Sequence, residues 1–179
     1  MKKHALAAIL CSPLLVTLTN AQHAGHPPPS PASPYAGMEK RAIKALSNSQ
    51  IGDIKAGRGM GLALAAELNG YPGPMHVLEL AGKLSLSPEQ RARMQGLMHA
   101  MKQETGATGE EVIAAEAALD RLFAEKRADA PSLAQAMKTV VEAQGKLRET
   151  HLRYHLDTRA ALTLEQIEGY ARLRGYTAH

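Results

Sequence analysis

The sequence is poor in cysteine and in aromatic residues: its 179 residues include one Cys, no Trp, one Phe and five Tyr. A single Cys can form neither an internal disulfide bond nor a cysteine-rich zinc site. So few aromatic side chains cannot build the stacking surfaces that bind single-stranded nucleic acids, and they argue against a large β-sandwich, because strands favour aromatic residues. We therefore expect no nucleic-acid partner.

The residues that are abundant favour helices. Hydrophobic residues make up 45% of the chain, and Ala, Leu, Met, Glu, Gln and Arg, all good helix formers, are frequent. At about 150 residues per domain, the length corresponds to one domain. The composition therefore predicts an all-α protein.

The first 21 residues have the pattern of a secretory signal peptide. Two lysines come first, residues 5–18 are mostly apolar, and residues 19–21 offer a small-residue cleavage site. The apolar stretch, about 14 residues, is shorter than the roughly 20 that a membrane-spanning helix needs. We therefore predict cleavage after residue 21, loss of Cys11 with the signal, export to the periplasm, and a mature protein that does not span the membrane.

The mature chain begins with a segment that cannot build a core. Residues 22–34 are rich in Pro and contain His23 and His26, so we expect a disordered arm, which could chelate copper or zinc, before a helical domain at 35–179. Without the signal, 19 Lys and Arg face 17 Asp and Glu, and the net charge falls from +4 to +2. That excess is too small to indicate binding to nucleic acid or to a membrane surface.

One local pattern occurs three times: Leu, then Ser or Thr, then two residues, then Gln. A Ser or Thr before a helix accepts a hydrogen bond from a free amide of the first turn, and a Gln three residues later reaches back to the amide of the cap residue. The pattern therefore predicts helices that start near residues 48, 88 and 164. The cap pairs are Ser47 with Gln50, Ser87 with Gln90, and Thr163 with Gln166.

Two long segments carry apolar or small residues at alternating spacings of three and four. The first runs from residue 94 to 122 and the second from 133 to 161, with a break at 129–132. This spacing predicts an elongated hairpin of two long antiparallel helices, preceded by short helices. Gly106 and Gly109 predict a kink in the first arm, where Thr108 would cap a new helix. A thin hairpin buries little surface per residue, so we expect a homodimer.

Two of the cap patterns, at residues 86–90 and 162–166, match the motif Leu-Thr-x-x-Gln, the first with Ser for Thr. On these motifs, the chain resembles the periplasmic LTxxQ family, which includes the stress chaperones Spy and CpxP and metal-linked proteins of the ZraP and CnrX kind. The resemblance implies a cradle-like, all-α dimer without enzymatic activity. It also implies one of two functions: holding unfolded envelope proteins, or sensing or buffering metal.

His151 and His155 lie one helical turn apart, a spacing at which both imidazoles can chelate one metal ion. The predicted alignment of the two long helices places Glu104 opposite His151 and Met101 opposite His155. These four side chains would suit zinc, nickel, cobalt or copper, and they resemble a CnrX-type site. The alternative is structural, with His151 hydrogen-bonded between the helices and His155 at the surface. Two further histidines have no partner at metal-binding spacing within the sequence: His76 and His99.

A second candidate site is a surface for unfolded clients. Met94 and Met98 are adaptable apolar side chains on one predicted helix face, and three basic residues would edge the groove: Arg91, Arg93 and Lys102. The alternative is that the methionines are hairpin core and the basic residues a solvated face.

The sequence contains no motif of a catalytic nucleophile or zinc hydrolase, so we expect no enzyme. Our first hypothesis is an ATP-independent, chaperone-like protein of the envelope and heavy-metal stress response, which binds unfolded or partly folded periplasmic proteins. The alternative is a periplasmic heavy-metal sensor or buffer that acts through His151 and His155, with a membrane signalling protein as its partner.

Overall fold

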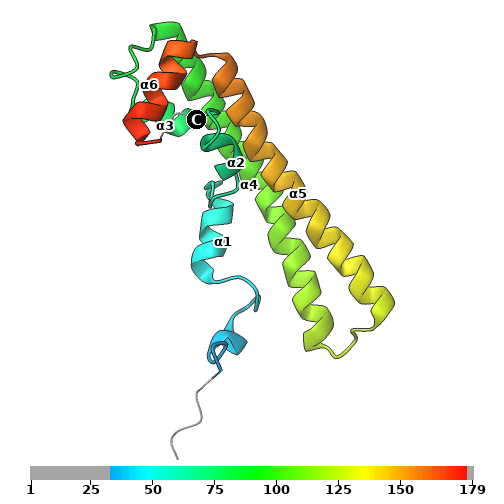
Figure 1. Cartoon of the computed structure of the whole chain (residues 1–179). Coiled ribbons are helices and arrows are strands. Elements are labelled where there is room, and N and C mark those ends of the chain that lie inside the picture. The colour runs from blue at the N-terminus through cyan, green and yellow to red at the C-terminus, as the bar shows by residue number, and fades with distance from the viewer. Residues whose placement is uncertain (1–32, 177–179) are drawn as a thin grey trace, which may run out of the picture. The chain divides into compact units, whose positions relative to one another are not determined.

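The computed structural model describes residues 33–176, and within that range it is helical, without β-strands (Figure 1). The predicted signal peptide, 1–21, and all but the end of the predicted arm, 22–34, lie outside the described residues. None of the described helices is long and apolar enough to cross a membrane. The elements are a short 3-10 turn, η1 (Met38–Lys40), followed by α1 (Asn48–Lys55), α2 (Leu64–Glu67), α3 (Pro74–Glu79), α4 (Pro88–Ala124), α5 (Ala130–Ala160) and α6 (Leu164–Arg174).

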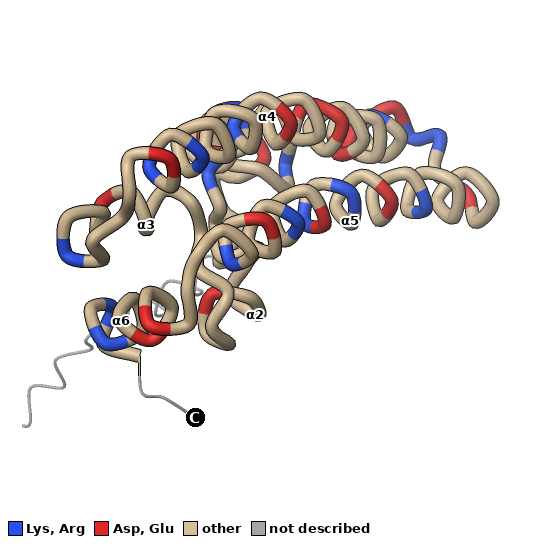
Figure 2. The backbone as a smooth tube through the Cα atoms, turned by 90° about the horizontal axis from the view of Figure 1, so that it is seen from above, with Lys and Arg blue, Asp and Glu red and all other residues tan. Residues whose placement is uncertain are grey.

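The two longest helices, α4 and α5, lie side by side and run in opposite directions (Figure 1). This confirms the predicted hairpin. Small and branched side chains fill the contact between them, and acidic and basic residues are interspersed along both helices (Figure 2). The ammonium group of Lys146 lies 2.7 Å from the carboxylate of Glu111 and joins the two arms at the surface. The buried members of this contact are Val112, Ala115, Val140, Ala143 and Leu147.

The predicted contact face of α5 is wrong near the hairpin tip. The predicted spacing, which starts at residue 133, includes Leu133 and Met137, but their side chains are 37% and 40% exposed. The buried contact begins with Val140, and from there the predicted spacing holds, since Leu147, His151, Tyr154 and Thr158 are buried as well.

The predicted interruption of α4 is also wrong, because the helix continues through both glycines. The hydroxyl of Thr108 donates to the carbonyl of Glu104 at 3.0 Å within the helix instead of capping a new one. The glycines serve a different purpose, since α1 packs against this part of α4. A Cβ atom at Gly109 would lie 2.6 Å from Cγ2 and 3.0 Å from the carbonyl oxygen of Ile54. Gly109 therefore allows the end of α1 to approach the α4 backbone closely.

All three predicted capping boxes are confirmed. They begin α1, α4 and α6. In each, the hydroxyl of the cap residue accepts a hydrogen bond from the backbone amide of the Gln, and the side-chain oxygen of the Gln accepts one from the backbone amide of the cap residue. A fourth box, Asp129 with Ser132, begins α5.

The boxes of α4 and α6 also contact each other. The side-chain amides of Gln90 and Gln166 donate to each other's oxygens at 2.9 Å. Each amide also donates to the backbone before the other helix: Gln90 to Ala161 O at 3.0 Å, and Gln166 to Leu84 O at 3.3 Å. The two motifs therefore tie the starts of these helices together above a core that contains Val77, Met94 and Tyr170.

Candidate functional site

Three of the four residues predicted to bind metal line one cavity. His151 and His155 of α5 and Met101 of α4 form one side of a cavity of about 310 Å³. The segment 59–76, which contains α2 and the start of α3, forms the other side. It adds four side chains with metal-binding atoms, Met60, Met75, His76 and the carboxylate of Glu67. We call this space the Met–His cavity and define it by its three methionines and three histidines.

His151 lies at the buried side of the cavity, with 2% of its surface exposed. Its Nε2 is 3.3 Å from the carbonyl oxygen of Arg58. Because a carbonyl only accepts, Nε2 carries the proton and Nδ1 carries the lone pair. Burial, followed by the nearby His155, lowers the pKa of His151. The imidazole is thus neutral at pH 7, which is the form that binds metals.

His155, one turn later, is held in the same way. Its Nδ1 donates to the carbonyl oxygen of Tyr71 at 2.6 Å, so Nε2 carries the lone pair. Nε2 lies beside Gly73, where a Cβ atom would be 3.0 Å away. The glycine therefore allows the imidazole ring and the backbone of segment 59–76 to approach each other closely.

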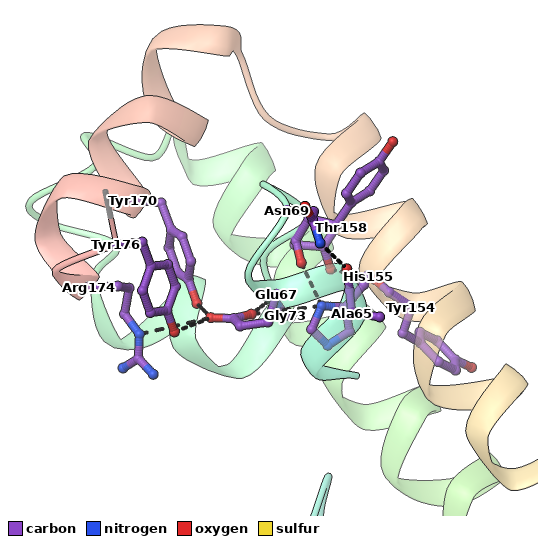
Figure 3. Close-up of polar contacts among 11 residues, drawn as sticks. Ala65, Glu67, Asn69, Gly73, Tyr154, His155, Thr158, Tyr170, Arg174 and Tyr176 are labelled. Carbon is purple, nitrogen blue, oxygen red and sulfur yellow. Dashed lines mark hydrogen bonds and ion pairs between the residues drawn. The ribbon is translucent and has the colours of Figure 1, made fainter. Parts of the chain in front are cut away.

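Glu67 of α2 is the buried acid next to His155, 9% exposed (Figure 3). Its Oε2 accepts from the Gly73 amide at 3.2 Å and lies 3.8 Å from His155 Nδ1. Its Oε1 accepts from the hydroxyls of Tyr170 and Tyr176, and lies 3.9 Å from Arg174. Burial, followed by the bond to Glu67, raises the pKa of Tyr170 above its usual range. Both carboxylate oxygens are therefore occupied by the protein.

His76 and Met60 are placed by segment 59–76. The Nδ1 of His76 lies 2.9 Å from the carboxylate of Glu79, one turn later on α3, so Nε2 carries the lone pair of the neutral ring. Met60 lies between two glycines and has a φ of 42°, in the left-handed region that side chains other than Gly rarely adopt. Sequence spacing did not find this partner for the α5 histidines, because segment 59–76 reaches them only through the tertiary fold.

Glu104, the fourth predicted ligand, does not line the Met–His cavity. It was expected opposite His151, but it meets the side chains two and three residues further along α5. Its carboxylate accepts from the Tyr154 hydroxyl at 2.7 Å and pairs with Arg153. Burial, followed by this bond, raises the pKa of Tyr154 to about 12. Figure 3 shows Tyr154 directed away from Glu67 and His155.

One of the two methionines of the predicted client surface is buried in the core. Met94 is 0% exposed and packs in the core with Val77 and Tyr170, so it requires correction from surface to core. Met98 is half-buried, and the three basic residues are exposed: Arg91, Arg93 and Lys102. What remains at the surface is mainly a charged helix face.

Among residues 33–176, no three His, Cys, Asp or Glu side chains are grouped closely enough to hold a metal ion. The Met–His cavity instead combines imidazole nitrogens with thioether sulfurs. Each of its histidines uses one ring nitrogen for a hydrogen bond to a carbonyl or carboxylate, and this is the usual arrangement of metal-binding histidines.

One protein-family model matches the chain over residues 59–168, and its description is heavy-metal resistance. The match begins next to Met60 and includes all six residues of the Met–His cavity. No curated protein and no solved structure matches the chain significantly.

Proposed function

Because the chain belongs to the heavy-metal resistance family, we propose that it binds heavy-metal ions directly, in the Met–His cavity. The observation that supports this most is the placement of three imidazoles and three thioethers around one space of about 310 Å³. An ion there would be held by His151, His155 and Met101 from the hairpin, as the sequence predicted in part. Members of this family are typically periplasmic, in keeping with the predicted signal peptide.

The hydrogen bonds of the histidines support the same proposal. A metal-binding imidazole needs one nitrogen for the ion and an acceptor for the other, which fixes the ring and its tautomer. Arg58 O serves His151, and Tyr71 O serves His155. Tyr71 lies within segment 59–76 and Arg58 directly before it. An ion bound between segment 59–76 and the hairpin would join the two, which suits a sensor or a buffer of metal.

Calorimetric titration with Zn(II), Ni(II), Co(II) and copper tests the proposal. The protein is a His23→Ala/His26→Ala variant, so that the arm contributes no imidazole. We expect His151→Ala/His155→Ala to weaken binding of the preferred ion by at least about tenfold, the loss seen when supports of a metal site are removed. The matched control is His99→Ala, which changes an exposed histidine of α4 outside the cavity. Equal affinity of the double variant and the control would refute the proposal.

For the exposed side of α5, the partner that we propose is a second copy of the chain. Val141 is 59% exposed, and Gly145 has open space where a Cβ atom would be. Residues 137 and 152 are equally far in sequence from the midpoint between residues 144 and 145, and so are residues 141 and 148. A two-fold axis at that midpoint would therefore place Met137 against Leu152 of the other copy and Val141 against its Arg148. A self-complementary patch is what a two-fold dimer requires.

A chaperone-like function is our second proposal, and it rests on the resemblance to Spy and CpxP. An aggregation assay with a denatured client at equimolar protein tests it, with and without zinc. Slower aggregation would support this function, and unchanged aggregation in both conditions would contradict it.

A further inference from the structure

We propose that the ion of the Met–His cavity is a soft, monovalent one, Cu(I) or Ag(I), held by thioethers of Met60, Met75 and Met101 together with imidazole nitrogen. This inference rests on the proposed function and specifies its ion. The two ions share one chemistry, since both are soft cations that accept few ligands.

The donor atoms of the cavity favour a soft ion. Thioether sulfur is a soft, neutral ligand that selects Cu(I), whereas zinc sites use thiolate, imidazole and carboxylate. Methionines supply three of the seven side chains with metal-binding atoms in the cavity lining, and they come from both of its walls: Met60 and Met75 from segment 59–76, and Met101 from α4. Imidazole suits copper equally well.

The charge of the cavity's donors also favours a monovalent ion. The carboxylate in the cavity lining, Glu67, already receives bonds from the Gly73 amide and two tyrosine hydroxyls and lies near Arg174. The remaining donors, imidazole nitrogens and thioether sulfurs, bring no negative charge. The cost of taking an ion out of water increases with its charge, so donors without negative charge at a partly buried site favour a monovalent ion over a divalent one.

The backbone conformation of Met60 is a further sign of a binding site. A φ of 42° is strained for a side chain with a Cβ atom, and it is unstrained for the glycines on either side, of which Gly61 has a φ of 79°. Strained residues cluster at ligand-binding sites, where the surrounding structure fixes them. Here the strained residue carries one of the thioethers of the cavity.

The exposure of the donors indicates how an ion would enter the cavity. Met60 and Met75 are 44% and 42% exposed, whereas His151 and His155 are 2% and 9% exposed. The thioethers of Met60 and Met75 therefore lie nearer the solvent than the imidazoles of His151 and His155. An incoming ion would meet these sulfurs first and could exchange from sulfur to nitrogen.

The test uses the full chain with His23→Ala/His26→Ala under reducing conditions, where Cu(I) is measured by competition with a chromogenic Cu(I) chelator and Ag(I) by calorimetry. We expect Met60→Leu/Met75→Leu/Met101→Leu to weaken binding of both ions by at least tenfold. The control is Met38→Leu, a methionine of η1 outside the cavity, which should leave affinity unchanged. Leu is close to Met in volume, and thermal unfolding of each variant checks that it folds.

A second measurement needs no variant. X-ray absorption at the copper edge of the Cu(I)-loaded protein should show sulfur as well as nitrogen neighbours. A copper shell of nitrogen or oxygen alone, or a triple Met variant with unchanged Cu(I) and Ag(I) affinity, would overturn this inference. If Ni(II) or Zn(II) binding still required His151 and His155, the proposed function would stand while its soft-ion form failed. If no ion required these histidines, both would fail.

Discussion

Gln90 and Gln166 each donate a hydrogen bond to the other's side-chain oxygen, at 2.9 Å in both directions. Each oxygen also accepts from the cap amide of its own helix, Ser87 N at 3.1 Å and Thr163 N at 3.0 Å. The glutamine of the motif therefore has two roles at once: it caps its own helix and binds the cap of the other. This explains why two Leu-Ser/Thr-x-x-Gln motifs far apart in sequence act as one structural unit.

A first prediction compares this pair with an isolated capping box. Gln90→Ala should lower the free energy of unfolding by about 1–3 kcal/mol, because it removes a cap and both hydrogen bonds between the two glutamines, in a partly buried place. The control is Gln50→Ala in the box of α1, whose Gln is exposed and should cost about 0.5–1 kcal/mol. Urea unfolding measures both. Equal losses would show that the contact between the two motifs contributes nothing.

A second prediction concerns two glycines of the same helix, α4. Gly109→Ala should destabilise the protein by about 1–3 kcal/mol, because the new Cβ atom would overlap Ile54 of α1. Gly96→Ala should instead stabilise it by about 0.5–1 kcal/mol, since open space surrounds that position and Ala is the better helix former. Chemical denaturation gives both values. Stabilisation by Gly109→Ala would mean that α1 does not pack there.

A third prediction follows from the lowered pKa of His151, which burial causes first and His155 second. An unfolded histidine has a pKa of about 6.5. Between the folded and unfolded pKa values the unfolded chain binds more protons, so this residue makes stability fall as the pH drops below about 6.5. We expect His151→Gln to lose less stability than the wild type between pH 7 and pH 5, in metal-free buffer. An identical decline in both proteins, measured by urea unfolding, would contradict the lowered pKa.

A fourth prediction tests the proposed dimer. Gly145→Glu should shift the mass in sedimentation equilibrium from dimer to monomer, because it would bury a carboxylate of each copy beside the two-fold axis, where the like charges repel. The control is Leu164→Glu, which changes a 71% exposed residue of α6 and should leave the mass unchanged. A wild type that is monomeric at high concentration would exclude this dimer.

The sequence was a good guide to the local features of the fold. Capping boxes depend on residues within one turn, so Ser47, Ser87 and Thr163 marked the starts of three helices correctly. The hairpin followed from the apolar spacing. Gly109 was misread as a helix breaker, because its role depends on α1, which is remote in sequence and contacts it only in the folded chain.

Three of the four residues named as metal ligands from the sequence line one cavity, and Glu104 does not. His151 and His155 could be paired because one helix fixes their spacing, and Met101 followed from the approximate alignment of the hairpin. The prediction for Glu104 was wrong, because a difference of two residues in the alignment of α4 with α5 places a different face of α5 opposite it. The wall formed by segment 59–76 could not be predicted, since no periodicity connects it to α5. The one signal was the occurrence of methionine beside glycine at residues 59–61 and beside histidine at 75–76.

The central claim is that a metal ion binds between segment 59–76 and the hairpin. The most direct measurement is a crystal structure of the metal-loaded protein, with anomalous diffraction recorded at the absorption edge of the bound metal. We predict one strong anomalous peak in the Met–His cavity, within bonding distance of nitrogens of His151 or His155 and of at least one methionine sulfur. Anomalous peaks only at His99 or at other surface sites, with an empty Met–His cavity at saturating metal, would contradict the account.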